Sequence, residues 1–227
     1  MRFQWMLGAA AVALLGSPVL AQDKPGGQVA ESFEREIKKT VKGDFLIALP
    51  KDYEKEATKK FPLLIFLHGA GERGSDLEMV KKHGPPKLIT AGKELPFIVV
   101  SPQCPTNERW SVDVLNGMYK HVTKKYRVDK ERVYLTGLSM GGFGTWEWAI
   151  DSPGKFAAIA PICGGGDPKK VAALKEMPVW VFHGGKDPVV PIKLSQDMVD
   201  ALKAIGSEVK FTIYPEAGHD SWTETYD

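Results

Sequence analysis

The sequence has only two cysteines in 227 residues, too few for the disulfide framework of a small secreted scaffold. No charge of one sign predominates, because 30 lysines and arginines stand against 28 aspartates and glutamates. The basic residues are not clustered with aromatic ones, as they are in a nucleic-acid-binding groove. No cysteine and histidine spacing resembles a metal site, and no apolar run is long enough to span a bilayer. We therefore expect no nucleic-acid partner, no bound metal and no stable membrane insertion.

The first residues predict an export signal. Arg2 supplies a positive charge, the stretch from Trp5 to Leu15 is a short apolar run, and Val19-Leu20-Ala21 resembles a cleavage site. A buried N-terminal helix is the alternative interpretation. We expect residues 1–21 to be a signal peptide and residues 22–227 to form one domain, located in the periplasm or outside the cell.

Short apolar runs alternate with helical stretches along the rest of the chain. Apolar residues in consecutive positions are typical of strands covered on both faces, and we expect strands at Leu63–Leu67, Phe97–Val100, Val133–Thr136, Phe156–Pro161, Val179–Phe182 and Val209–Tyr214. Helices are expected at Asp76–Thr90, Ser111–Tyr126, Met140–Ile150, Pro168–Leu174 and Ile192–Ile205. This order predicts an α/β fold with a mostly parallel central sheet and helices on both faces. Phe33–Val41 and Phe45–Leu49 are expected to add an N-terminal antiparallel hairpin.

Cys104 and Cys163 each follow an expected strand. If two other strands lie between those two, three inter-strand spacings separate the cysteines by roughly 14 Å. Bridged Cα atoms lie about 4.4–6.8 Å apart. Export would permit a disulfide, but this geometry favours two free thiols.

The segment Gly137-Leu138-Ser139-Met140-Gly141 follows an expected strand and precedes an expected helix. A nucleophilic serine is often placed on such a sharp turn, where glycines leave room for the crossing backbones. The N–H of Met140 would then point at a developing oxyanion. An ordinary glycine-rich turn with an idle serine is the alternative.

Ser139 as a nucleophile needs a base that is oriented by a carboxylate. His219 follows the last expected strand and is our choice for the base, because His68, His83, His121 and His183 lie on a helix, beside prolines or at strand ends. Asp187 follows the next-to-last strand and is our choice for the acid, with Asp167 and Asp220 as alternatives. A second oxyanion donor is expected in the loop 68–74, where Ala70 is the first choice and Gly71 the second. A phosphate cradle is disfavoured because no Gly-Lys-Ser/Thr follows this loop.

The motifs LHGAGERG (67–74), SPQCP (101–105), GLSMGGFGTW (137–146), FHGGKDPVVP (182–191) and GHDSW (218–222) together resemble a known family. They are similar to α/β-hydrolase serine esterases of the phospholipase/carboxylesterase, feruloyl esterase and polyhydroxybutyrate depolymerase-like group related to dienelactone hydrolase. The resemblance covers Phe45 to the C-terminus. It implies an α/β-hydrolase fold, a triad of Ser139, Asp187 and His219, and oxyanion donors at Ala70 and Met140.

The resemblance implies a serine carboxylesterase with no cofactor, acting through an acyl-enzyme on Ser139. The segment between Cys163 and Pro178 is too short for a cap domain, so we expect an open site for short-chain, aromatic or carbohydrate-linked esters. Gly71, Gln103, Trp110 and Trp222 are candidate substrate-binding residues; the two tryptophans form an aromatic platform or simply pack the loops down. A prolyl-oligopeptidase-type serine peptidase and a non-catalytic carbohydrate-binding protein are the alternative functions.

Overall fold

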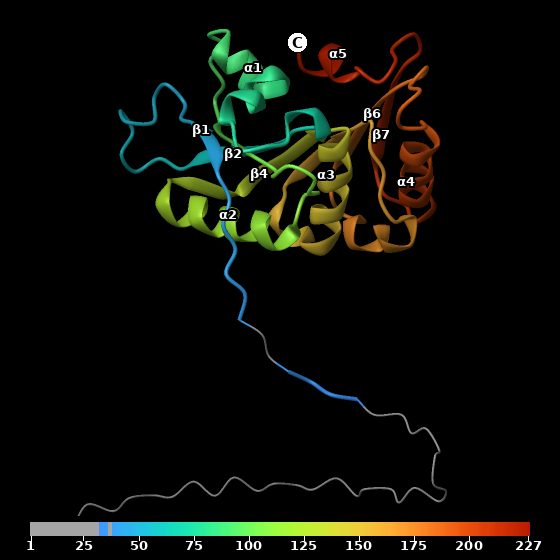
Figure 1. The fold of residues 1–227 in the computed structure, drawn as a ribbon, viewed down its shortest axis with the longest axis horizontal. Coiled ribbons are helices and arrows are strands. Elements are labelled where there is room, and N and C mark those ends of the chain that lie inside the picture. Colours follow the sequence, from blue (N-terminus) through green and yellow to red (C-terminus); the bar gives the residue numbers. More distant parts are fainter. Residues whose placement is uncertain (1–31, 36–37) are drawn as a thin grey trace, which may run out of the picture. The chain divides into compact units, whose positions relative to one another are not determined.

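A computed structural model describes residues 32–35 and 38–227. The chain divides into two units, residues 1–39 and 40–227, and every helix and strand of the described residues lies in the second unit (Figure 1). The predicted signal peptide, residues 1–21, lies outside the described residues. Among the helices of the described part, none is both long and apolar enough to cross a bilayer.

The second unit is built around one sheet. Its strands in the described residues are β1 (Phe45–Ala48), β2 (Phe61–Leu67), β3 (Ile98–Pro102), β4 (Val128–Leu138), β5 (Ala158–Ile162), β6 (Val179–Gly184) and β7 (Val209–Tyr214). Their order across the sheet is β1-β3-β2-β4-β5-β6-β7. β1 is antiparallel to β3, and all other neighbouring pairs are parallel. The predicted mostly parallel sheet is confirmed.

The antiparallel pair at the start of the sheet is not the predicted hairpin. β1 pairs with β3, with Phe45 opposite Pro102, and the described residues of the first expected strand, 33–35 and 38–41, form no strand. In that segment Phe33, Ile37 and Val41 are the apolar residues, and they recur every fourth position. The segment therefore lacks the alternation that buries one face of a strand.

The helices surround this sheet. In the described residues they are α1 (Gly84–Thr90), α2 (Val112–Lys125), α3 (Met140–Asp151), α4 (Lys193–Ala204) and α5 (Trp222–Tyr226), with 3₁₀ turns η1 (Ala70–Glu72), η2 (Leu77–Lys82), η3 (Pro153–Lys155) and η4 (Pro168–Leu174). The helix expected over 76–90 is divided at His83, which is extended, and Gly84, whose φ is +61°. Pro85 and Pro86 lie in the first turn of α1, because proline fits there but not in the interior of a helix.

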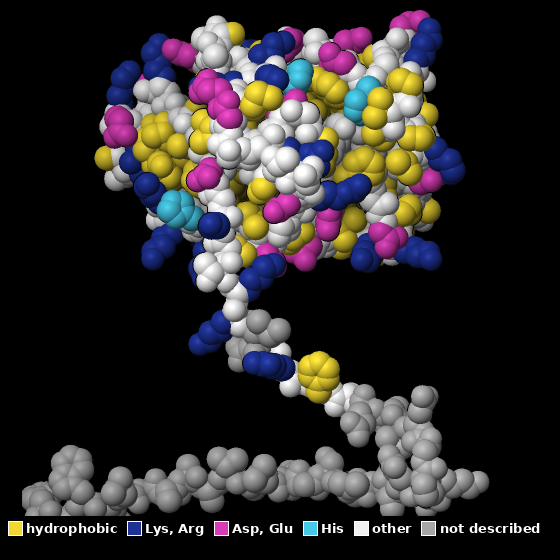
Figure 2. Space-filling view, in the orientation of Figure 1, with side chains coloured by type: hydrophobic (Ala, Val, Ile, Leu, Met, Phe, Trp, Pro, Cys, Tyr) yellow, Lys and Arg dark blue, Asp and Glu magenta, His cyan; other side chains and the backbone are white. Residues whose placement is uncertain are grey.

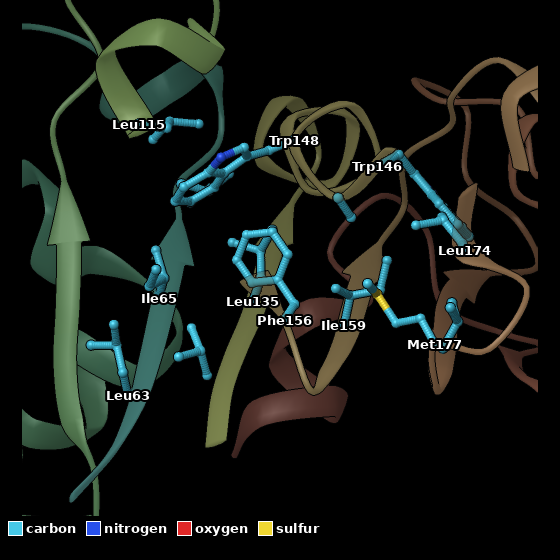
Figure 3. Close-up of a cluster of buried hydrophobic side chains, with 14 of the residues drawn as sticks. Leu63, Ile65, Leu115, Leu135, Trp146, Trp148, Phe156, Ile159, Leu174 and Met177 are labelled. Atoms are coloured by element: carbon cyan, nitrogen blue, oxygen red, sulfur yellow. The ribbon is translucent and has the colours of Figure 1, made fainter. Parts of the chain in front are cut away.

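Alternate residues of the strands build a core on each face of the sheet. On one face Leu63, Ile65 and Leu135 pack against Trp148 of α3 and Leu115 of α2, and Figure 3 shows the strand side chains facing those of the two helices. On the other face a smaller cluster joins Phe66, Leu138, Ile162, Cys163 and Phe182 to Trp222 and Tyr226 of α5. Helices or turns thus cover both faces, as predicted.

The second face is only partly covered. A groove of about 790 Å³ opens over it, lined among others by Leu64, Tyr134, Ala160 and Trp180, and Trp180 is 46% exposed. Elsewhere the surface carries lysines, arginines, aspartates and glutamates interspersed with one another, as Figure 2 shows for one view. This mixture agrees with the balanced charge of the sequence.

Both cysteines are free and buried. Cys104 follows β3 and Cys163 follows β5, and β2 and β4 lie between those strands. The prediction of free thiols is therefore confirmed, for the geometric reason given by the strand order.

Candidate active site

The site lies at the carboxyl edge of the sheet, where β4, β6 and β7 run parallel. Ser139 directly follows β4, Asp187 follows β6, and His219 follows β7. Because parallel strands end at the same edge of a sheet, residues far apart in sequence meet there.

Ser139 occupies a strained turn between β4 and α3. Its φ is +51° and its ψ is −116°, in the left-handed region that a residue with a side chain rarely adopts. Its N–H donates a hydrogen bond to the Ile162 carbonyl oxygen at 3.0 Å. A Cβ on Gly137 would lie 2.6 Å from the carbonyl carbon of Gly141, so the turn closes only with glycine at that position.

The structure brings Ser139, His219 and Asp187 into one hydrogen-bonded line. His219 Nε2 lies 3.0 Å from Ser139 Oγ, and His219 Nδ1 lies 2.8 Å from Asp187 Oδ2. The Asp187 side chain is fully buried, whereas that of His219 is 20% exposed. With Nδ1–H donating to the carboxylate, Nε2 is free to accept the serine proton.

Asp187 is held from two sides. Its Oδ1 accepts hydrogen bonds from the backbone N–H groups of Val189 at 2.8 Å and Val190 at 2.9 Å. Burial raises the pKa of this carboxyl, but the hydrogen bonds from His219, Val190 and Val189 outweigh burial and lower it overall. The group therefore remains an anion beside the histidine.

The two alternative acids, Asp167 and Asp220, form hydrogen bonds with the backbone of their own turns. Asp167 Oδ1 accepts the Lys169 N–H at the start of η4, and Asp220 Oδ1 accepts the Thr223 N–H beside α5. Both arrangements satisfy exposed backbone donors at the start of a helix. The structure places Asp187, and neither of these two, against His219.

The glycine-rich loop after β2 lies against the serine. A Cβ on Gly69 would be 3.7 Å from Ser139 Cβ, and η1 begins at the next residue, Ala70. Met140 begins α3, and the first N–H groups of a helix have no partner within it. Gly71 is exposed, with open space where a side chain would be.

Trp110 and Gln103, two residues predicted to bind substrate, are hydrogen-bonded to the backbone of this loop. Trp110 is 7% exposed; its Nε1–H donates to the His68 carbonyl oxygen at 3.2 Å, and its ring contacts the His68 ring edge-on. Gln103 is 6% exposed, and its amide donates to the Glu72 carbonyl oxygen. Both side chains are buried against the loop, and a direct contact of either one with substrate stays a prediction.

Trp222 differs from Trp110. It is half-buried at the start of α5, and its ring lies edge-on to the rings of His219 and His83, at centroid distances of 5.1 Å and 5.5 Å. Trp222 is therefore placed beside the candidate base, where a platform was expected.

His83 and Glu72 were not identified as site residues from the sequence. His83 contacts the ring of Trp222, and Glu72 lies close to His83. Glu72 is 7% exposed, and its Oε1 lies 3.7 Å from His83 Nε2. The signal available was a charged residue inside the glycine-rich loop, Gly71-Glu72-Arg73-Gly74. A buried carboxylate there is costly unless something pairs with it.

Cys163, Asp187 and His219 have potential metal-ligand atoms within 4.8 Å of one another. Burial raises the pKa of the Cys163 thiol to about 12. Asp187 and His219 are hydrogen-bonded to each other. Both nitrogens of His219 are thus occupied by hydrogen bonds with Asp187 and Ser139, an arrangement that fits a serine nucleophile better than a metal site.

Comparison with known proteins gives consistent results. Residues 105–226 match the model of the dienelactone hydrolase family. A putative carboxymethylenebutenolidase of Methylorubrum extorquens is 33% identical over 102 residues, which are 41% of this chain and 35% of that protein. The chain thus spans about a third of this relative.

Solved structures with the same fold include esterases and acylaminoacyl peptidases. A thermostable esterase aligns with a TM-score of 0.70 and 36% identity over 80% of this chain and 55% of its own. A ferulic acid esterase aligns with a TM-score of 0.63 and 21% identity over 80% of this chain and 86% of its own. The predicted α/β-hydrolase fold is confirmed.

Proposed function

Because the chain belongs to the dienelactone hydrolase family, we propose that it is an exported serine carboxylesterase. Its substrates are short-chain, aromatic or carbohydrate-linked esters. The observation that carries the proposal is the hydrogen-bonded line from Ser139 Oγ through His219 to Asp187 Oδ2. Such a line is the arrangement that activates a serine as a nucleophile.

In the first half of the reaction Ser139 Oγ attacks the ester carbonyl carbon. His219 Nε2 takes the serine proton, and Asp187 stabilises the imidazolium that results. The N–H groups of Ala70 and Met140 donate to the oxyanion, and each such donor contributes about 2.7–4 kcal/mol to the transition state. The intermediate then collapses, His219 gives its proton to the leaving alcohol, and the acyl group stays on Ser139.

In the second half water replaces the alcohol. His219 Nε2 removes a proton from the water as it attacks the acyl-enzyme, and the same two N–H groups bind the second oxyanion. His219 returns the proton to Ser139 Oγ as the acid is released. The cycle uses no metal or organic cofactor.

The substrate class follows from the openness of the site. Between β5 and β6 the structure has only the short turn η4, so a long acyl chain has little apolar surface to bury it. Gly71 is exposed in the loop after β2, and Trp222 offers an aromatic ring beside His219. We propose that Trp222 contacts a phenolic or sugar ring of the substrate.

Two other functions use the same scaffold. A prolyl-oligopeptidase-type serine peptidase would cleave peptide bonds with the same triad, and a non-catalytic carbohydrate-binding protein would need no activated serine.

Export rests on the predicted signal peptide, residues 1–21, and would place the enzyme in the periplasm or outside the cell.

Turnover of p-nitrophenyl acetate by purified protein separates these functions. We expect release of p-nitrophenol by the native enzyme and its loss in Ser139→Ala, with the Tm of the variant close to that of the native protein. A panel of peptide p-nitroanilides should show little cleavage. Activity that persists in Ser139→Ala would remove the serine mechanism, and preferential cleavage of the anilides would favour the peptidase.

A further inference from the structure

His183 is a buried histidine directly behind the candidate acid. It lies in β6, is fully buried, and precedes Asp187 by four residues. Its Nε2 lies 2.9 Å from the Val190 carbonyl oxygen and 3.3 Å from Asp187 Oδ2, and its Nδ1 lies 2.8 Å from Ser195 Oγ. The ring therefore joins β6 to the acid loop and to α4.

Counting hydrogens fixes which atom of the His183 ring donates to the acid loop. The Val190 carbonyl and the Asp187 carboxylate can only accept, so Nε2 of His183 carries the hydrogen. Burial lowers the pKa of His183 and keeps the ring neutral. Nδ1 then has a free lone pair, 2.8 Å from Ser195 Oγ. Ser195 is fully buried, and its Oγ also lies 2.8 Å from the Gly164 carbonyl oxygen. Its single hydroxyl hydrogen can be donated to only one of these two acceptors at a time.

The Nε2–H group faces the one carboxylate oxygen that the peptide N–H groups do not hold. Oδ1 accepts from Val189 and Val190, whereas Oδ2 lies between His219 Nδ1 at 2.8 Å and His183 Nε2 at 3.3 Å. His183 also binds the carbonyl oxygen of Val190, the residue whose N–H donates to Oδ1. It thus contacts the carboxylate and restrains the loop that holds it.

We propose that His183 is a positioning residue that holds the Asp187 carboxylate in place for His219; the proposal rests on the proposed function. His183 does not touch the reacting atoms. Without its Nε2–H group, the carboxylate can turn and the hydrogen bond to His219 loses its fixed direction. Proton transfer at Ser139 then slows, while substrate binding on the other side of His219 is unaffected.

Two substitutions separate the two ring nitrogens. In His183→Gln the amide nitrogen reaches the position of Nε2 and can still donate to the Asp187 loop. In His183→Asn the amide reaches only the position of Nδ1 and keeps the contact with Ser195. We expect His183→Asn to lower kcat for p-nitrophenyl acetate by up to about a hundredfold with KM nearly unchanged, and His183→Gln to recover most of the loss.

A control removes the effect of reduced stability. Leu202 is fully buried in α4, within the core cluster and away from the triad, so Leu202→Ala should lower the Tm without lowering kcat per active site. Active sites are counted by labelling Ser139 with a fluorophosphonate, so that unfolded molecules do not enter kcat.

The outcomes distinguish failure of the positioning role of His183 from failure of the proposed serine esterase function. If the native enzyme does not turn over the ester, or Ser139→Ala still does, the serine esterase function fails. If Ser139 is essential but His183→Asn keeps the native kcat per labelled site, the positioning role is wrong. Equal losses in His183→Gln and His183→Asn would also overturn it, because then the Nε2 donor is not what matters.

Discussion

The carbonyl group of Leu67 occupies the space that a side chain at Gly141 would need. A Cβ built on Gly141 overlaps the Leu67 carbonyl oxygen and lies 2.5 Å from its carbonyl carbon. Leu67 ends β2 and Gly141 lies in the first turn of α3, so the two backbones cross in direct contact next to Ser139. This contact is the physical reason for the second glycine of the serine turn.

Gly141→Ala should therefore be strongly destabilising. The new methyl group meets backbone, which cannot move as a flexible side chain would, and overpacking of this kind costs about 1–3 kcal/mol or more. Chemical denaturation of the variant measures the loss. Gly154→Ala is the matched control, because a Cβ there has nothing within 4 Å. If the two variants lose the same free energy of unfolding, the contact between Gly141 and the Leu67 carbonyl group does not limit the side chain at position 141.

Asp187→Asn should lower kcat by about 10⁴ through loss of the carboxylate that orients the histidine. Asp167→Asn and Asp220→Asn should have small effects, because these carboxylates accept hydrogen bonds from backbone N–H groups near helix starts. Steady-state kinetics with p-nitrophenyl acetate compares the three variants. A larger loss at Asp220 would move the acid to the histidine loop.

The stability that Asp187 contributes should disappear in acid. Its pKa is lowered in the folded state, because hydrogen bonds outweigh burial, so the unfolded chain takes up a proton more readily. The contribution is then complete above the unfolded pKa of about 3.9 and is lost as the pH falls through the lower folded value. The difference in Tm between the native protein and Asp187→Asn should be constant from pH 5 to pH 7, roughly the range above that pKa, and should narrow below it. If the Tm difference instead widens in acid, the pKa of Asp187 is not lowered in the folded state.

The open site should favour short acyl chains. Each buried CH₂ is worth about 0.8 kcal/mol only where apolar surface can bury it, and η4 is the only helical element between β5 and β6. We expect kcat/KM to peak between acetyl and butyryl esters, to fall by octanoyl, and to show no jump above the critical micelle concentration. Preference for long chains would indicate an apolar groove beside Trp222.

The two thiols should not react in the folded protein. Burial raises the pKa of Cys104 to about 11 and that of Cys163 to about 12, so neither forms the thiolate that attacks a disulfide reagent near pH 8. Ellman's reagent should detect about two thiols after denaturation, as the sequence contains, and almost none before it. Rapid reaction of the native protein would show that one cysteine is accessible.

The sequence alone predicted the sheet and the serine–histidine–aspartate line well. Ser139, Asp187 and His219 each follow an apolar run, and these runs became β4, β6 and β7. A parallel sheet brings such strand ends together whatever the details of the loops. The line could therefore be inferred without knowing any contact between distant residues.

The lining of the site could not be inferred in this way. Trp110 and Trp222 look alike in sequence, since both are expected in loops near the same edge. Trp110 is buried because it packs on Gly144, where a Cβ would lie 2.7 Å from the indole ring, a contact between segments far apart in the chain. The break at Gly84 had a local signal, the two prolines that follow it, which the helical pattern of 76–90 obscured.

The position of β7 has a consequence for the order in which the protein folds. β7 is an edge strand that pairs with β6, and it carries the loop that brings His219 across 80 residues to Ser139. The strands β6 and β7 are neighbours in sequence, but the contact between His219 and Ser139 is distant, and loop closure precedes any gain from such a contact. During refolding, the ability to hydrolyse an ester should therefore return only when β7 has docked on β6 and His219 has reached Ser139, later than the helical signal.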